Sequence, residues 1–146
     1  MNGLALLNRF YQPDVDLDSL KVIPKLELSS SMESLLRIRW VALLHGRVNL
    51  SLAVTGGFHT TEDILKALLA GADVTHLCSA LLHHGPELIT ELLSDLNAWL
   101  DEHEYESVSQ LKGSISQEHA IEPAAYERAN YVNVLDSFSY PTGVLR

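Results

Sequence analysis

The chain has 146 residues, of which 47% are hydrophobic and 20% are charged, a composition typical of one globular domain rather than of a disordered or fibrous protein. Its formal net charge of −9 disfavours general binding to nucleic acid or to an anionic membrane, because most of the surface would repel phosphate groups. A single cysteine excludes an internal disulfide and a cysteine-based zinc site, and the lack of a signal peptide or long apolar segment in the sequence predicts a cytoplasmic location.

The first predicted element is an apolar strand at residues 3–7, Gly-Leu-Ala-Leu-Leu. A strand that is apolar on both faces is typical of a parallel sheet covered by helices. Because a domain seldom begins inside such a strand, we expect further structure to precede it.

Residues 11–31 are rich in Pro, Asp and Ser and predict a long loop with room for a short hairpin. The position of this loop after the carboxyl end of a strand favours a lid over a binding site, and an ordinary surface excursion explains the composition equally well.

A capping box formed by Ser30 and Glu33 predicts that a helix follows the loop and ends at Gly46. The helix has a broad apolar stripe, which we expect to face the core. Its members are Leu35, Leu36, Ile38, Trp40, Val41, Leu43 and Leu44.

The next stretch, residues 50–85, predicts strand, glycine turn, helix, strand and second turn. An apolar run ends at Gly56-Gly57, a capping box of Thr60 and Asp63 starts a helix that ends at Gly71, and a second strand closes on Cys78-Ser79. Since both strands run parallel, both turns lie at the carboxyl edge of one sheet, where backbone N–H groups can approach an anion. The alternatives are a plain tight turn at Gly56-Gly57 and a simple helix N-cap at Ser79.

The last predicted helices are less regular. One begins at Pro86, carries Trp99 on its apolar stripe and ends at about His103; a short one covers 108–111; and another begins at Pro123. The last has a mixed apolar pattern made of Tyr126, Ala129, Tyr131, Val134 and Leu135, and the final residues are expected to fray.

Several residues have a structural interpretation beside a functional one. Cys78 is predicted to be a buried packing residue rather than a nucleophile, and His76 is expected to point to the same side as Cys78. Trp40 and Trp99 are expected in the core. No metal site is predicted, because the adjacent His83 and His84 point in different directions and lack a third ligand at a suitable spacing.

The chain resembles the carboxyl-terminal part of the FMN-dependent dihydroorotate dehydrogenases, most closely a dihydroorotate dehydrogenase-like branch. The matching segments are LLNRFYQPD (6–14), AVTGGFHTTEDILKALLAGAD (53–73), CSALLHHGPE (78–87) and EHEYESVSQLKGSISQ (102–117). This resemblance implies an α/β fold that is the C-terminal part of a (β/α)8 TIM barrel, with strands six to eight in residues 1–104 and a C-terminal helical tail in 105–146.

The resemblance also implies a flavoprotein site. The positions that bind the FMN phosphate in the family correspond to Gly56, Gly57, Cys78 and Ser79, although Cys78 replaces the usual glycine. The family's substrate-binding asparagine corresponds to Asn8. Arg9 stands where a small hydroxyl residue is more common. The family's catalytic base and a lysine near the flavin fall before Met1, so no catalytic residue is assigned in this chain.

The implied function is that of an oxidoreductase fragment of pyrimidine biosynthesis, related to the oxidation of dihydroorotate to orotate and inactive alone. The alternatives are a non-catalytic FMN- or phosphate-binding half-barrel module and a truncated product. Because three parallel strands leave open edges, we expect either a homo-oligomer or pairing with a separate N-terminal half.

Overall fold

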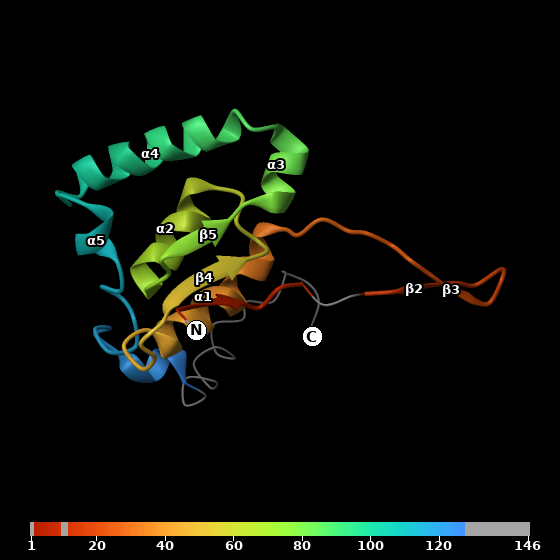
Figure 1. The fold of residues 1–146 in the computed structure, drawn as a ribbon, viewed down its shortest axis with the longest axis horizontal. Coiled ribbons are helices and arrows are strands. Elements are labelled where there is room, and N and C mark those ends of the chain that lie inside the picture. The colour runs from red at the N-terminus through yellow and green to blue at the C-terminus, as the bar shows by residue number, and fades with distance from the viewer. Residues whose placement is uncertain (1, 10–11, 128–146) are drawn as a thin grey trace, which may run out of the picture.

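The structure is a computed structural model that describes residues 2–9 and 12–127 (Figure 1). The predicted helical residues Ala129, Tyr131, Val134 and Leu135 lie outside these ranges. In chain order the elements are β1 (Gly3–Leu6), β2 (Asp14–Asp16), β3 (Lys21–Ile23), η1 (Ser31–Glu33), α1 (Ser34–Leu44), β4 (Ser51–Thr55), α2 (Thr61–Ala70), β5 (Val74–His76), α3 (Cys78–His84), α4 (Leu88–Glu102), α5 (Val108–Leu111) and η2 (Pro123–Tyr126).

The main sheet is parallel and has the strand order β1-β4-β5, as the predicted βα units require. Leu4 lies opposite Leu52 across the first pairing, and Ala53 lies opposite Val74 across the second. The sheet is open in the part of the chain that the structure describes, and its arrangement is compatible with part of a barrel.

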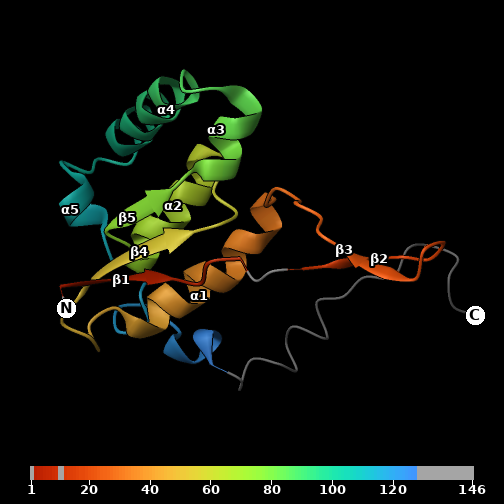
Figure 2. The ribbon, with the colours of Figure 1, turned by 45° about the vertical axis from the view of Figure 1, so that its right-hand side comes forward.

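The helices follow the order of the strands. α2 packs between α1 and α4, so α1 is the outermost helix on the β1 side and α4 the outermost on the β5 side (Figure 2). One hydrophobic cluster joins the sheet to α1 and includes Leu52, Val54 and Val41; a second joins α2 to α4. No helix in the described ranges is both long and apolar enough to cross a bilayer.

The ends of α2 confirm the predicted caps. The Thr60 Oγ1 accepts a hydrogen bond from the Asp63 backbone N at 3.2 Å, and Asp63 Oδ2 accepts one from the Thr60 backbone N at 3.1 Å. Gly71 ends the helix with φ of 115°, a conformation that glycine adopts without strain. The capping pair contributes about 1 kcal/mol to helix stability.

Part of the tail forms a strap, residues 113–117, across the carboxyl ends of two helices. The backbone N atoms of Gly113 and Ile115 donate to Leu68 O and Leu69 O of α2, each at 3.0 Å. The backbone N of Gln117 donates to Ala42 O of α1, also at 3.0 Å. The strap therefore gives Ala42 O and Leu69 O backbone donors near the helix ends, where carbonyl groups lack intrahelical partners, and adds a second donor to Leu68 O, which also accepts from Gly71 N.

The loop between β1 and α1 contains the predicted hairpin. β2 pairs with β3 in antiparallel fashion, and Asp16 accepts hydrogen bonds from the Ser19 hydroxyl at 2.8 Å and the Asp18 backbone at 3.0 Å. These bonds, first of all the one from the Ser19 hydroxyl, lower the pKa of the Asp16 carboxyl. The hairpin extends away from the sheet instead of lying over the predicted turns (Figures 1 and 2).

The prediction for Trp40 was wrong. Val41 and Ala42 are buried, but Trp40 is 42% exposed and Leu36, one turn earlier, is 51% exposed. The cause is that α1 is apolar around most of its circumference, whereas α2 and the sheet cover only one side of it. Trp99 is partly buried, and its ring stacks on His103 with a centroid distance of 3.9 Å.

Candidate functional site

The two predicted turns lie at the carboxyl edge of the sheet. Gly56 and Gly57 follow β4 with φ of 85° and 94°, and Cys78 and Ser79 open α3 directly after β5. Since β4 and β5 are neighbours in the sheet, the turns that follow them are neighbours as well.

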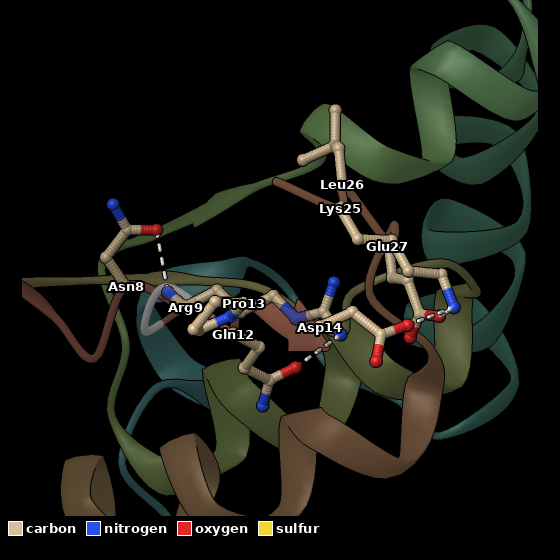
Figure 3. A pocket seen from close by; sticks show the side chains of 8 residues that line it. All are labelled: Asn8, Arg9, Gln12, Pro13, Asp14, Lys25, Leu26 and Glu27. Atoms are coloured by element: carbon tan, nitrogen blue, oxygen red, sulfur yellow. Dashed lines mark hydrogen bonds and ion pairs between the residues drawn. The ribbon is translucent and has the colours of Figure 1, made fainter. Parts of the chain in front are cut away.

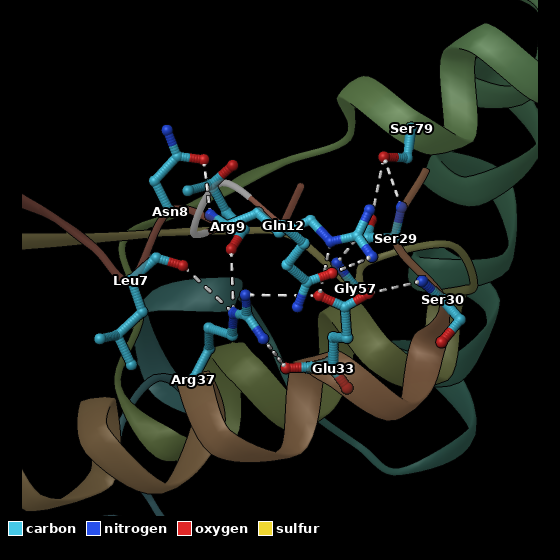
Figure 4. A network of polar contacts seen from close by, with 12 residues as sticks. Leu7, Asn8, Arg9, Gln12, Ser29, Ser30, Glu33, Arg37, Gly57 and Ser79 are labelled. Carbon is cyan, nitrogen blue, oxygen red and sulfur yellow. Dashed lines mark hydrogen bonds and ion pairs between the residues drawn. The ribbon is translucent and has the colours of Figure 1, made fainter. Parts of the chain in front are cut away.

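The turns converge on one oxygen atom, the hydroxyl of Ser29 (Figure 4). Gly57 N donates to Ser29 Oγ at 3.1 Å, and Ser29 Oγ donates to Ser79 Oγ at 2.9 Å. The backbone N of Ser29 also donates to Ser79 Oγ, at 3.2 Å, and the Nε2 of His59 lies 3.4 Å from Ser29 Oγ. Ser29 is buried. The edge therefore holds an oxygen atom between a backbone amide and a hydroxyl.

Ser79 is not the N-cap of α3, because Leu77 holds that position and Ser79 lies within the helix. Its hydroxyl is directed to Ser29. The sequence did not predict this hydrogen bond between Ser29 and Ser79.

Packing alone explains the glycine at position 57. A Cβ atom there would overlap the backbone N of Ser34 and lie 2.8 Å from the carbonyl carbon of Glu33, at the start of α1. A Cβ at Gly56 would lie 3.3 Å from the Arg37 guanidinium, which is a tight contact. The glycine pair thus brings the β4 turn close to α1 whether or not a ligand is present.

Arg37 joins the carboxyl ends of two strands and is a residue that the sequence reasoning missed. Its side chain is buried, and its Nε donates to Leu7 O at 3.2 Å and to Thr55 O at 3.3 Å. Its Nη1 donates to Glu33 O at 2.6 Å. A signal was present in the sequence, since Arg37 stands among the apolar residues of the predicted helix stripe.

Two arginines share one carboxylate at this edge. Glu33 Oε2 lies 3.3 Å from Arg9 Nε and 3.6 Å from Arg37 Nη2. Arg9 also donates from Nη2 to Gln12 Oε1 at 3.4 Å. Glu27 also lines the cavity beside Arg9, so two arginines face two glutamates at this edge and their formal charges cancel.

Two adjoining cavities open at the edge. One of about 240 Å³ is lined by the five residues assigned to FMN or substrate, namely Asn8, Gly56, Gly57, Cys78 and Ser79, together with Arg9, Ser29 and His76. The other, of about 580 Å³, lies between Asn8-Arg9 and residues 25–27, the segment that follows β3 (Figure 3). The structure therefore brings all the predicted site residues to one cavity.

Three single-residue expectations have different outcomes. Cys78 is exposed, so its predicted burial was wrong; it opens α3 at the mouth of the cavity and packs against no core cluster. His76 lines the same cavity as Cys78, as expected. Asn8 lines both cavities, and its Oδ1 accepts a hydrogen bond from the Arg9 backbone N at 2.8 Å.

Lys25 and Arg9 are the cationic residues that line the larger cavity. The Nζ of Lys25 lies 2.7 Å from Glu27 Oε1 and 3.7 Å from Asp14 Oδ2. The hydrogen bond and charge of Glu27, followed by the charge of Asp14, raise the pKa of Lys25. The same pair, first through its hydrogen bond, lowers the pKa of Glu27.

Asp63 connects this edge to the start of α2. Its Oδ2 accepts hydrogen bonds from Ser31 Oγ at 2.7 Å and from the His59 backbone N at 3.1 Å, in addition to the Thr60 cap. Burial by itself would raise the pKa of the Asp63 carboxyl, but the hydrogen bonds from Ser31, His59 and Thr60 together outweigh it and hold that pKa below 3.8.

The fold and the edge define an α/β protein with parallel βα units in which the Gly57 amide and the Ser79 hydroxyl meet at the Ser29 hydroxyl, at the carboxyl ends of the strands. No family model matches the chain. The chain is similar to individual proteins that are named dihydroorotate dehydrogenases.

The chain is 34% identical over 58 residues to the dihydroorotate dehydrogenase (quinone) of Trichormus variabilis and to that of Trichodesmium erythraeum; these residues are 40% of this chain and 15% of each relative. It is 26% identical over 115 residues, 77% of this chain and 38% of the relative, to the catalytic subunit of dihydroorotate dehydrogenase B (NAD(+)) of Shouchella clausii. The matches thus span well under half the length of these relatives. They support a distant relationship to dihydroorotate dehydrogenases and, at that level, to the oxidoreductases of pyrimidine biosynthesis.

Proposed function

We propose that the chain is part of a dihydroorotate dehydrogenase-like flavin oxidoreductase and that its sheet edge binds the phosphate of FMN. Gly56, Gly57, Cys78 and Ser79 would line the phosphate position. Asn8, beside Arg9, would face the dihydroorotate-like substrate. FMN, when bound, supplies the oxidising group; no catalytic residue is assigned to this chain.

The observation that carries the proposal is the convergence at Ser29. The Gly57 amide and the Ser79 hydroxyl lie within hydrogen-bond distance of one oxygen atom, 3.1 Å and 2.9 Å away. A phosphate oxygen that replaced the Ser29 hydroxyl would find the same partners, because an amide N–H and a hydroxyl both donate to phosphate. Binding of a phosphate at this position therefore requires the Ser29 side chain to move away from Gly57 N and Ser79 Oγ.

The size of the cavity agrees with a phosphate at this position. The cavity of about 240 Å³ is smaller than the roughly 300 Å³ at which sites for drug-sized ligands begin. It therefore suits the phosphate end of a nucleotide better than the whole of one.

Ser79→Asp tests the proposal in the full chain. Aspartate is tolerated near a helix start, yet its carboxylate would repel the phosphate, so we expect FMN to bind at least tenfold more weakly. Ser107→Asp is the matched control: Ser107 is the exposed N-cap of α5, away from the cavity, and the change should leave FMN affinity unaltered. Gly57→Asp is a poorer test, because its side chain would overlap Ser34.

Binding is measured by the quenching of flavin fluorescence on titration, and folding by circular dichroism. If Ser79→Asp and the wild type both fold and bind FMN with equal affinity, the proposal of a phosphate site at this edge is wrong. Failure of the wild-type chain to bind FMN at millimolar concentration would have the same consequence.

A second candidate is a non-catalytic FMN- or phosphate-binding module. The observation that favours it is the cavity of about 240 Å³, which suits a phosphate group better than a whole nucleotide with its substrate. The two functions are separated by adding dihydroorotate to the FMN-loaded chain together with the N-terminal half of a dihydroorotate dehydrogenase, because the chain is expected to be inactive alone. Bleaching of the flavin absorbance then supports the oxidoreductase, and an unchanged spectrum supports the module.

A further inference from the structure

Both edges of the main sheet end without a neighbour among residues 2–9 and 12–127. Ser51 N donates to Asn2 O across the β1–β4 pairing, and Asp73 N donates to Leu52 O across the other side. Backbone groups alternate in direction along a strand, so those of Gly3 and Ala5 face out from β1 and those of Val74 and His76 face out from β5. Each edge thus offers donors and acceptors to another parallel strand.

The helix layer is also unfinished at both ends. On α1, the outermost helix beside β1, Leu36 is 51% exposed and Trp40 accompanies it on the same face. On α4, the outermost helix beside β5, Leu93 is 52% exposed and Ile89 lies one turn before it. An apolar cavity of about 230 Å³ continues this face between β5 and α4. Apolar surface therefore flanks both open edges.

The two ends differ in charge. Arg39 is the exposed charged residue of α1, because Arg37 is buried and α1 contains no acidic residue, whereas α4 contains no basic residue. The acidic residues of α4 are Glu91, Asp95, Asp101 and Glu102. Contact between α1 of one chain and α4 of another is thus favoured by charge, while contact between two α4 helices is disfavoured.

We propose that two copies of this chain pair head to tail, with β5 of one copy beside β1 of the next and α4 of the first packed on α1 of the second. The pairing continues the parallel sheet and the helix layer in one step, and each contact uses one β1 edge and one β5 edge. The loop with Asn8 and Arg9 of the second copy would then adjoin Cys78-Ser79 of the first. The inference rests on the edges and faces alone and does not require FMN.

Two substitutions test it in the full-length chain. Leu36→Glu alters the α1 face and Leu93→Glu the α4 face; both residues are half-exposed, so each variant should fold as a single chain. Leu17→Glu is the matched control in the hairpin turn, at a residue 80% exposed and far from both edges.

The measurement is molar mass by sedimentation velocity across a concentration series, with circular dichroism for folding. We expect association of wild type and of Leu17→Glu, and at least tenfold weaker self-association of each edge variant, equivalent to about 1.4 kcal/mol or more. An equimolar mixture of Leu36→Glu and Leu93→Glu should restore a dimer, because it contains one unaltered α1 face and one unaltered α4 face that can meet.

Other outcomes overturn the proposal. A monomeric wild type at all concentrations excludes the pairing. If only one of the two edge variants dissociates, the contact joins like faces, and if the mixture stays monomeric, the two faces do not meet. Should Leu93→Glu fail to fold, Val74→Pro replaces it in the same mixture, since it removes an outward-facing N–H of β5.

Discussion

Replacing Arg37 with methionine tests whether the carboxyl ends of β1 and β4 depend on one guanidinium group. Methionine keeps the length of the aliphatic stem and removes the donors. The carbonyl groups of Leu7, Thr55 and Glu33 would each lose a donor at a position that is buried or partly buried.

The expected cost follows from these hydrogen bonds. A hydrogen bond to a charged group contributes about 1.5–3 kcal/mol, and a buried acceptor left without a donor costs about 1–3 kcal/mol. Since the arginine is only 7% exposed, screening by solvent reduces these values little. Its own transfer from water offsets part of the gain, so we expect a loss of about 3–5 kcal/mol in the free energy of unfolding. This is a large fraction of the roughly 5–15 kcal/mol of a whole domain.

The assay is urea unfolding followed by circular dichroism, with the midpoint and the slope fitted separately. Arg39→Met is the matched control on the same helix, because Arg39 is exposed and donates from Nε to Tyr126 O at 2.9 Å. It should cost about 1 kcal/mol or less. If Arg37→Met is no more destabilising than Arg39→Met, the guanidinium does not hold the strand ends together.

The remaining predictions concern the cavity and acid stability. Ser29→Ala removes the hydroxyl that occupies the Gly57 amide, so inorganic phosphate should bind up to about tenfold more tightly by isothermal titration; unchanged or weaker binding would contradict the proposed replacement. Burial alone would raise the pKa of Asp73, but the Lys112 side chain and the Leu52 backbone N–H hold the pKa of its carboxyl below 3.8, as hydrogen bonds hold that of Asp63. Because a lowered folded-state pKa means that the charged carboxylate stabilises the fold, this stability is present above the unfolded value of 3.8 and is lost as the pH falls through the lower folded values. Urea midpoints should therefore drop as the pH falls below about 4, and less so in Asp73→Asn.

The elements that depend on local signals were predictable from the sequence. The capping box of Thr60 and Asp63, the left-handed Gly71 and the apolar strands on either side of α2 each follow from residues a few positions apart. The short hairpin at 14–23 was also foreseen. Such patterns fix a βαβ unit because each one is set by neighbours along the chain.

The contacts of the site depend on residues far apart in the sequence, and they were not predictable in the same way. Ser29 meets Ser79 although 50 positions separate them, and Ser29 lies in a loop whose composition carries no such signal. Arg37 binds carbonyl groups of two strands, a role that becomes visible only when β1 and β4 lie side by side. The exposure of Trp40 has the same origin, since an apolar pattern marks a helix without stating which of its sides is covered.

The strap at residues 113–117 has a consequence for the order of assembly. The last turns of α1 and α2 obtain their hydrogen-bond partners from a segment that is synthesised well after both helices. Until that segment emerges from the ribosome, the carbonyl groups of Ala42 and Leu69 lack the backbone donors that the strap gives them. The ends of α1 and α2 are therefore completed late in the synthesis of this protein.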